Sequence, residues 1–346
     1  MAADRPAQDR VARLQRVEHR ALGDSGSQLA KTYRITILIP VATRVPFRKG
    51  DGQAEGGRLS GRTARRRVLR VTLPGDGRPG GSAARADFLA GEEPLGIRVD
   101  GTALTMTMRT PGDDLELAAG FLVSEAVIRS LADIAGIKLC DGTACGHVDH
   151  HGAAHDGMGN IAEVTLAAGV ELAPGTRRNF VTTSACGLCG KASIEDICVL
   201  PHAPLAADTA RFAPDMLAAL PDRLRDAQRV FSRTGGLHAA GLFTADGELI
   251  AVREDVGRHN AVDKVVGWAL LDDRLPLAGC VLLVSGRASF ELVQKAVLAG
   301  IPLLAAVSAP SSLAVDLAEE AGLTLVGFLR GPSMNVYTGA HRLAAP

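Results

Sequence analysis

Short stretches of alternating apolar and polar residues mark the strands of the first half of the chain. Leu95–Val99 and Ala103–Met108 alternate in this way, and Asp100-Gly101, a dipeptide typical of tight hairpin turns, separates them. The sequence therefore predicts a hairpin here. Further strands are predicted at Arg67–Leu73, Ile134–Leu139, Ile161–Leu166 and Asn179–Thr183.

One helix is predicted within this strand-rich half. Apolar residues at Leu117, Phe121 and Ile128 recur at helical spacing over Asp113–Ile128. Pro111 precedes the segment and carboxylates open it, which favours a helix start at this point. Residues 68–180 are thus predicted to form one mixed domain with several strands.

The second half alternates strands with helices of about ten residues. A first pair of strands, Ala239–Phe243 and Leu249–Arg253, flanks the turn Asp246-Gly247. Such alternation indicates βαβ units and a mainly parallel sheet, so we predict an α/β domain over residues 181–346 and an α+β chain as a whole. The later elements are predicted at Asn260–Leu271 (helix), Cys280–Val284 (strand), Ser289–Leu298 (helix), Leu303–Val307 (strand), Ser311–Ala321 (helix) and Thr324–Leu329 (strand).

Charge separates the first 67 residues from the rest. They contain 15 Lys and Arg against 6 Asp and Glu, an excess of +9, and because the whole chain balances 38 against 38, the remainder carries −9. The basic stretch is rich in Gly and polar residues and ends in Arg65-Arg66-Arg67, which indicates a disordered leader over residues 1–67. A nucleic-acid-binding arm is the alternative, but the stretch contains no recognisable binding module and the acidic remainder argues against nucleic acid as the main ligand.

The apolar residues form no pattern typical of a membrane protein. Their share, 47 %, is that of a globular protein. The longest apolar run, Ala296–Ala309, contains Gly300 and Pro302 and is too short to span a bilayer. The chain opens with no signal-peptide pattern, so we predict a cytoplasmic protein.

Two of the six cysteines stand in the glycine-rich loop Cys186-Gly187-Leu188-Cys189-Gly190. In a long intracellular chain, closely spaced cysteines suggest chemistry or metal binding rather than structural bridges. Lys191 and a predicted helix over Ser193–Ile197 favour the thiolate, which is the reactive form. A thiolate can accept a sulfur atom as a persulfide and pass it on, so Cys186 and Cys189 are the predicted catalytic residues.

Three other interpretations of the pair remain open. A structural zinc site needs a second ligand pair, and the Cys140–His155 loop offers cysteines and histidines at a spacing that matches no standard arrangement. A thioredoxin-like dithiol usually has an aromatic residue before its first cysteine, where this chain has Ala185. A purely structural pair is disfavoured because glycine-rich loops bury little. Two further cysteines, predicted to be inert core thiols, are Cys198 and Cys280.

Polar clusters follow successive predicted strands of the second half. In an open α/β sheet, ligands bind beyond the carboxyl ends of the strands. Ser289 and Ser311 open predicted helices, whose free N–H groups can bind phosphate, although either serine could be an ordinary N-cap. The arginines of the clusters could equally pair with nearby carboxylates, and no dinucleotide fingerprint or P-loop is present. The residues predicted to contact a phosphate-containing ligand are Arg253, Asp255, Arg258, His259, Ser285, Gly286, Arg287, Ser289, Ser308 and Ser311.

Taken in order, these segments resemble the formate dehydrogenase accessory sulfurtransferase (FdhD) family. The resemblance covers nearly everything after residue 68, and its ordered set of motifs is far more specific than the cysteine pair alone. The matching segments are Glu93–Leu95, Met108–Asp113, the CGLCG loop, Gly235–Ala240, Arg253–Lys264, Ser285–Glu291, Ser308–Ala314, and the GFLRG and NVYT segments near the end.

The resemblance implies a two-domain protein whose C-terminal half has a cytidine-deaminase-like, three-layer α/β fold. It implies that a cysteine desulfurase passes sulfur to Cys186 as a persulfide. We expect Cys189 to resolve this persulfide or to share the sulfur. The sulfur then goes to the molybdenum of a bis-(molybdopterin guanine dinucleotide) cofactor, bound as substrate, before insertion into formate dehydrogenase. The resemblance also implies a homodimer without a resident metal. The segment that it assigns to cofactor binding is Phe328, Leu329, Arg330, Gly331, Pro332 and Ser333.

The chain departs from the family in two places. The family often has Gly-Arg-Phe where this chain has Pro332-Ser333-Met334, which removes a candidate phosphate-binding arginine. The leader and the Cys140–His155 loop are also unusual. No H-x-E motif paired with P-C-x-x-C is found, so deaminase chemistry is not expected. Two alternative functions are a cofactor-binding chaperone without sulfur transfer and a zinc-stabilised interaction module.

Overall fold

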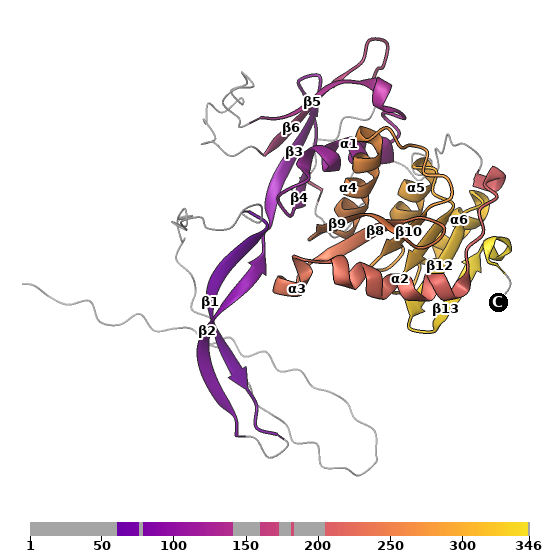
Figure 1. Cartoon of the computed structure of the whole chain (residues 1–346). Coiled ribbons are helices and arrows are strands. Elements are labelled where there is room, and N and C mark those ends of the chain that lie inside the picture. The colour runs from indigo at the N-terminus through magenta and orange to yellow at the C-terminus, as the bar shows by residue number, and fades with distance from the viewer. Residues whose placement is uncertain (1–60, 76–78, 141–159, 173–180, 183–204, 345–346) are drawn as a thin grey trace, which may run out of the picture. The chain divides into compact units, whose positions relative to one another are not determined.

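The computed structural model describes residues 61–75, 79–140, 160–172, 181–182 and 205–344 (Figure 1). Within them, the first half forms a five-stranded sheet of order β5-β6-β3-β4-β7. The predicted hairpin is confirmed, because β3 and β4 pair antiparallel around Asp100 and Gly101, whose φ values of 48° and 74° fit a type I′ turn. The strands are β3 (Glu93–Val99), β4 (Thr102–Arg109), β5 (Ile134–Cys140), β6 (Ile161–Leu166) and β7 (Val181–Thr182).

A two-stranded ribbon precedes this sheet. Its strands β1 (Thr63–Thr72) and β2 (Gly81–Ala90) pair antiparallel over their whole length. The sequence predicts β1 but not β2, because the small residues of β2 show no clear alternation. β1 begins at Thr63, so the described structure reaches into the segment predicted as the leader.

The second half is built on a six-stranded sheet of order β13-β12-β11-β10-β8-β9. Only the pairs β10–β11 and β11–β12 are parallel, whereas β12–β13, β10–β8 and β8–β9 are antiparallel. The prediction of a mainly parallel sheet is therefore wrong, because hairpins extend the parallel core on both sides. The strands are β8 (His238–Phe243), β9 (Leu249–Asp255), β10 (Val281–Val284), β11 (Leu303–Ala306), β12 (Thr324–Arg330) and β13 (Ser333–Thr338).

Helices cover both faces of this sheet (Figure 1). Leu282 and Val284 of β10 belong to a core shared with α4 (Arg258–Leu271), α5 (Phe290–Leu298) and α6 (Ser312–Glu320). Val281 and Leu283 point the other way, into a second core beneath α2 (Pro214–Ala227). This alternation follows the period of two along a strand, and it confirms a mixed α/β fold with a helix–sheet–helix arrangement.

Helix α1 (Asp114–Ser124) attaches the five-stranded sheet to the second half by packing against α4. One continuous core therefore contains Ile97 of β3, Leu122 of α1 and Val266 of α4. The predicted division at residue 180 stays a prediction. No helix in the described ranges is long and apolar enough to cross a membrane. The short helices are α3 (Phe231–Thr234), η1 (Leu131–Asp133), η3 (Leu205–Ala207) and η4 (Ala340–Arg342).

Candidate functional site

The predicted catalytic pair, Cys186 and Cys189, lies outside the described residues, and its role stays a prediction. Two other cysteines are described. Cys140 ends β5, is 4 % exposed and is disulfide-bonded, so the expectation that cysteines here serve chemistry or metal rather than bridges is wrong for this residue. Cys280 is a half-buried free thiol whose pKa is raised by burial and by Asp208, which favours the unreactive protonated form.

The predicted polar clusters meet at one edge of the six-stranded sheet. β8 is antiparallel to both β9 and β10, and β10, β11 and β12 are parallel to one another. The carboxyl ends of β9 to β12 therefore lie at the same edge. Helices α4, α5 and α6 follow β9, β10 and β11, so their N-termini, which favour anions, also start there.

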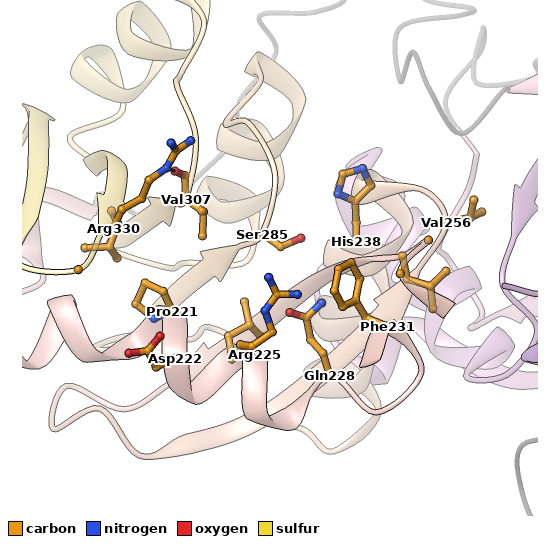
Figure 2. Close-up of a pocket in the computed structure, with 16 residues that line it drawn as sticks. Pro221, Asp222, Arg225, Gln228, Phe231, His238, Val256, Ser285, Val307 and Arg330 are labelled. Carbon is orange, nitrogen blue, oxygen red and sulfur yellow. Dashed lines mark hydrogen bonds between the residues drawn. The ribbon is translucent and has the colours of Figure 1, made fainter. Parts of the chain in front are cut away.

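A cavity of about 640 Å³ opens at this edge between the strand ends and α2 (Figure 2). Its volume is in the range of about 300–1,000 Å³ that small-molecule sites occupy. It contains Ser285, Leu329, Arg330 and Gly331 of the predicted binding residues. The other lining residues are Pro221, Asp222, Leu224, Arg225, Gln228, Phe231, Gly235, Gly236, Leu237, His238, Val256 and Val307.

The predicted cofactor-binding segment forms one wall through an irregular end of β12. Phe328 adopts a left-handed φ of 51° and is 40 % exposed, whereas Leu329 is fully buried. The Arg330 Nε donates to the Val307 carbonyl over 2.8 Å, which holds the guanidinium across the end of β11. Gly331, at φ 52°, then turns the chain toward Ser333, the exposed first residue of β13. Pro332 is also exposed, and neither of these last two residues lines the cavity.

His238 lies at the opposite end of the cavity (Figure 2). Burial and the neighbouring Arg258 and His259 lower the pKa of its imidazole below the usual value. A Cβ added to Gly286 would lie 3.4 Å from His238 Nδ1 and 3.7 Å from Arg258 Cδ, so these three residues are neighbours. This end of the cavity is therefore lined by an imidazole that favours the neutral form, and Arg258 lies next to that imidazole without lining the cavity.

The two helix-opening serines have different roles. The Ser311 Oγ accepts the Ala314 N–H over 3.3 Å, which makes Ser311 an ordinary N-cap. The Ser289 side chain makes no such bond, and its Oγ lies 3.2 Å from His259 Nε2. His259 Nε2 is also 3.7 Å from a Glu291 carboxylate oxygen. Burial raises the pKa of that carboxyl, but hydrogen bonds from His259 and Ser289 outweigh burial and lower it to about 2.

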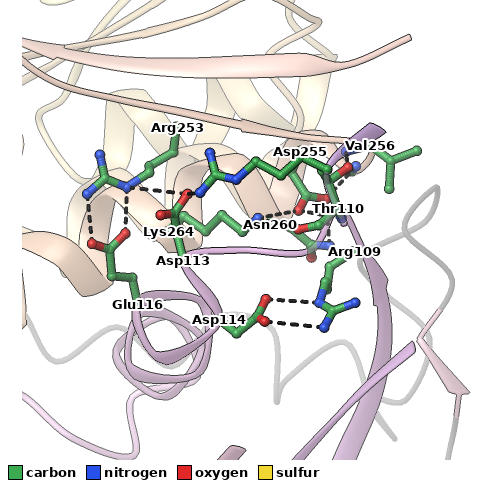
Figure 3. A network of polar contacts seen from close by, with 12 residues as sticks. Arg109, Thr110, Asp113, Asp114, Glu116, Arg253, Asp255, Val256, Asn260 and Lys264 are labelled. Atoms are coloured by element: carbon green, nitrogen blue, oxygen red, sulfur yellow. Dashed lines mark hydrogen bonds and ion pairs between the residues drawn. The ribbon is translucent and has the colours of Figure 1, made fainter. Parts of the chain in front are cut away.

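Asp255, another predicted ligand-binding residue, is fully buried in a network that joins the two halves (Figure 3). Its Oδ2 lies 2.8 Å from Lys264 Nζ and accepts the Thr110 N–H over 3.0 Å. Its Oδ1 accepts from the Gly257 N–H over 2.8 Å and from Asn260 Nδ2 over 3.0 Å. The carboxylate is thus fully used within the protein, which favours a structural role.

The guanidinium of Arg253 is likewise bound by carboxylates of the protein. Its guanidinium donates to Glu116 of α1, with Nη2 at 2.7 Å from Oε1, and its Nε is 4.0 Å from Asp113 (Figure 3). This partner differs from the local carboxylates considered from the sequence. Arg109, which is 2 % exposed, likewise binds Asp114 through two nitrogens at 2.9 and 3.2 Å. These ion pairs hold α1 and the end of β4 in place.

The remaining predicted residues lie near the edge without lining the cavity. Arg287 is exposed, and the Ser308 carbonyl accepts the Phe328 N–H over 3.1 Å. The sequence missed the wall contributed by Arg225, Gln228 and Phe231. Leucines at positions 217, 220 and 224 have helical spacing and could have identified α2, but nothing local connects this helix to the strand ends.

Comparisons with known proteins agree on one family. Residues 90–344 match the model of the FdhD/NarQ family. The chain is 57 % identical over 286 residues to "Sulfur carrier protein FdhD" of Nocardia farcinica, covering 82 % of this chain and 96 % of the relative. It is 59 % identical over 285 residues to the protein of the same name from Streptomyces coelicolor, with the same coverage. A crystal structure assigned as a formate dehydrogenase accessory protein, from Desulfotalea psychrophila, has the same fold, with a TM-score of 0.60, 24 % identity and coverage of 82 % and 99 %.

Proposed function

Because the chain belongs to the FdhD/NarQ family, we propose that it carries sulfur on Cys186 and delivers it to a molybdenum cofactor destined for formate dehydrogenase. The names of its close relatives support a sulfur carrier in general. The single structural observation that supports cofactor binding is the cavity at the strand ends, because it gathers Ser285 and the Leu329–Gly331 segment around one space. A cysteine desulfurase is the proposed donor, and a cytoplasmic homodimer is the proposed working form.

In the proposed loading step, the Cys186 thiolate attacks the terminal sulfur of the desulfurase persulfide. A new S–S bond forms on Cys186, and the desulfurase cysteine leaves as a thiolate. In the delivery step, the Cys189 thiolate attacks the Cys186 sulfur and displaces the terminal sulfur as sulfide to the metal. The transferred sulfur gains two electrons while the pair is oxidised to a disulfide, which a cellular thiol then reduces.

The proposed substrate is bis-(molybdopterin guanine dinucleotide), which is anionic through its phosphates. Arg225 and Arg330 place positive charge on the cavity wall, and the N-termini of α4, α5 and α6 start at the same edge. These features fit phosphate groups. Arg253 and Asp255 are not proposed as direct contacts, because protein partners already use their charged groups.

Intact-mass spectrometry after incubation with a cysteine desulfurase and cysteine tests the sulfur-carrier role. We expect wild type to gain about 32 Da, one sulfur atom, in a form that a thiol reductant removes. Cys186→Ala should gain nothing, whereas Cys280→Ala serves as the matched control and should gain sulfur like wild type, because burial and Asp208 raise the pKa of the Cys280 thiol.

The same variants separate sulfur transfer from a cofactor chaperone. Under both functions Cys186→Ala should still bind the cofactor, so only the sulfur-loading result distinguishes them. If an active desulfurase added no sulfur to wild type, the persulfide mechanism would be wrong and the chaperone function would be favoured.

A further inference from the structure

Gln228 has a buried side chain whose hydrogen-bonding groups are unused. The residue is 4 % exposed and lines the 640 Å³ cavity. Its backbone is satisfied, because its N–H donates to the Arg225 carbonyl over 3.2 Å and its carbonyl accepts the Ser232 N–H over 3.1 Å. No hydrogen bond to its carboxamide is found among the residues that the structure describes. The carboxamide atoms are not fully enclosed by protein, so they are reached from the cavity, where a ligand can supply the missing hydrogen-bond partners.

The surroundings of Gln228 suit a flat ring. Leu224, Leu237 and Leu329 line the same cavity and are buried, so they give its mixed polar and apolar lining an apolar part. The Arg225 guanidinium carbon lies 4.6 Å from the centre of the Phe231 ring, and both side chains also line the cavity. Figure 2 shows the Gln228 carboxamide directed into the cavity beside these two residues. Aromatic and guanidinium faces stack on planar heterocycles.

We infer that Gln228 reads the edge of a planar heterocycle that carries adjacent N–H and C=O groups. Its Oε1 accepts from the ring N–H, and its Nε2 donates to the ring carbonyl, so one side chain makes two parallel hydrogen bonds. This edge belongs to 2-amino-4-oxopyrimidine rings, which occur both in guanine and in the pterin of molybdopterin. The inference rests on the proposed function and assigns a specificity-determining contact within its substrate site.

Electrostatics separates this contact from the charged part of the cavity. A neutral carboxamide offers one acceptor and two donors but no charge, so it gains little from a phosphate that arginine binds better. Arg330, held at the end of β11, is the group suited to phosphate. The cavity thus offers a ring the neutral Gln228 carboxamide beside Arg225 and Phe231, and offers its anionic substituent the guanidinium of Arg330.

Calorimetric titration of the full chain tests the inference with GDP and unsubstituted pterin as probes. Gln228→Met keeps the length of the side chain and removes both hydrogen bonds, and should weaken binding of the recognised probe about tenfold. Gln228→Ala is a second variant in case the first does not fold. Arg229→Met is the matched control, because Arg229 is exposed and does not line the cavity.

Ring-methylated probes show whether the edge itself is read. Methyl groups at N1 of GDP or N3 of pterin remove the N–H donor, and should weaken binding to wild type about tenfold but to Gln228→Ala less than about twofold. The probe whose affinity follows Gln228 identifies guanine or pterin as the ring. Equal GDP and pterin affinities in wild type and both variants would overturn the inference while leaving the proposed function intact. If neither probe bound to wild type, cofactor binding at this cavity would fail as well.

Discussion

Gly120 of α1 and Gly267 of α4 bring the backbones of their two helices into direct contact. A Cβ on Gly120 would lie 1.8 Å from the Asp263 carbonyl oxygen, and a Cβ on Gly267 would lie 1.8 Å from the Glu116 carbonyl oxygen. Neither collision can be relieved by a side-chain rotation, because backbone atoms are on both sides. The contact fixes how the five-stranded sheet attaches to the second half.

Gly267→Ala should therefore destabilise the protein although alanine is the better helix former. Helix propensity favours alanine by about 1 kcal/mol, whereas forcing two packed helices apart costs about 1–3 kcal/mol or more. We expect a net loss in the free energy of unfolding, measured by urea denaturation. Gly136→Ala is the control, because a Cβ there meets nothing within 4 Å. Equal stability of Gly267→Ala and wild type would mean that the two helices can separate freely.

The buried ion pair of Lys264 and Asp255 should stabilise the folded protein. Both side chains are at most 1 % exposed and their charged atoms are 2.8 Å apart. Lys264→Met leaves the Asp255 carboxylate buried without its cation, which costs about 3–5 kcal/mol in unfolding free energy. Asp255→Asn combined with Lys264→Met should recover part of that loss. Arg274→Met removes an exposed pair with Asp272 and should cost less than about 1 kcal/mol.

The same denaturation series decides between two roles for Asp255. If Asp255→Asn left stability unchanged but abolished cofactor binding, the carboxylate would be a ligand contact, as the sequence predicts. Loss of stability with nucleotide affinity retained in the folded fraction would support the structural role that its buried contacts indicate.

Local signals explain which parts of the fold could be predicted. The β3–β4 hairpin is encoded by Asp100 and Gly101, because the turn needs positive φ at two consecutive positions. The order of the six-stranded sheet is not local, since β8 pairs with β10 across residues that include a whole helix. Alternating strands and helices predict its parallel core, and the turn Asp246-Gly247 marks the connection from β8 to β9, but neither signal shows that β8 pairs with β10.

The residues of the candidate site also fall into those that local sequence signals could place and those that depend on tertiary packing. Ser285 follows a strand and could be placed at the sheet edge by topology alone, whereas Arg330, which ends β12, was identified through the family resemblance. Gln228 could not be placed in either way, because its position depends on how α2 packs over strands that come later in the chain. The ion pair of Arg253 with Glu116 could not be predicted from the sequence either, because Glu116 precedes Arg253 by 137 residues.

Glu291 should make stability depend on pH in the acidic range. Its pKa of about 2 in the folded protein is below its ordinary value of 4.5. The ionised carboxylate therefore stabilises the fold fully above about pH 4.5 and loses this contribution as pH falls toward 2. Allowing for partial solvent screening, the contribution is on the order of 1–2 kcal/mol.

Urea denaturation at pH 6 and pH 3.5 measures this contribution. Glu291→Gln should be less stable than wild type at pH 6, and the difference should shrink at pH 3.5. Glu320→Gln, a change at an exposed position of α6, should show no such trend. A difference that stayed constant between the two pH values would mean that packing, and not ionisation, accounts for the role of Glu291.

Arg330 should contribute affinity for the anionic part of the substrate. Its Nε is bonded to the Val307 carbonyl, which leaves the two terminal nitrogens to bind a phosphate. Arg330→Ala should weaken GDP binding about tenfold, the scale of one charge-assisted hydrogen bond. Because this term is electrostatic, the loss should be smaller at high salt. Arg330→Lys keeps the charge but not the planar fork, so we expect an intermediate affinity. An Arg330→Ala protein that bound GDP like wild type at both salt concentrations would show that the phosphate lies elsewhere, at the N-termini of α4 or α5.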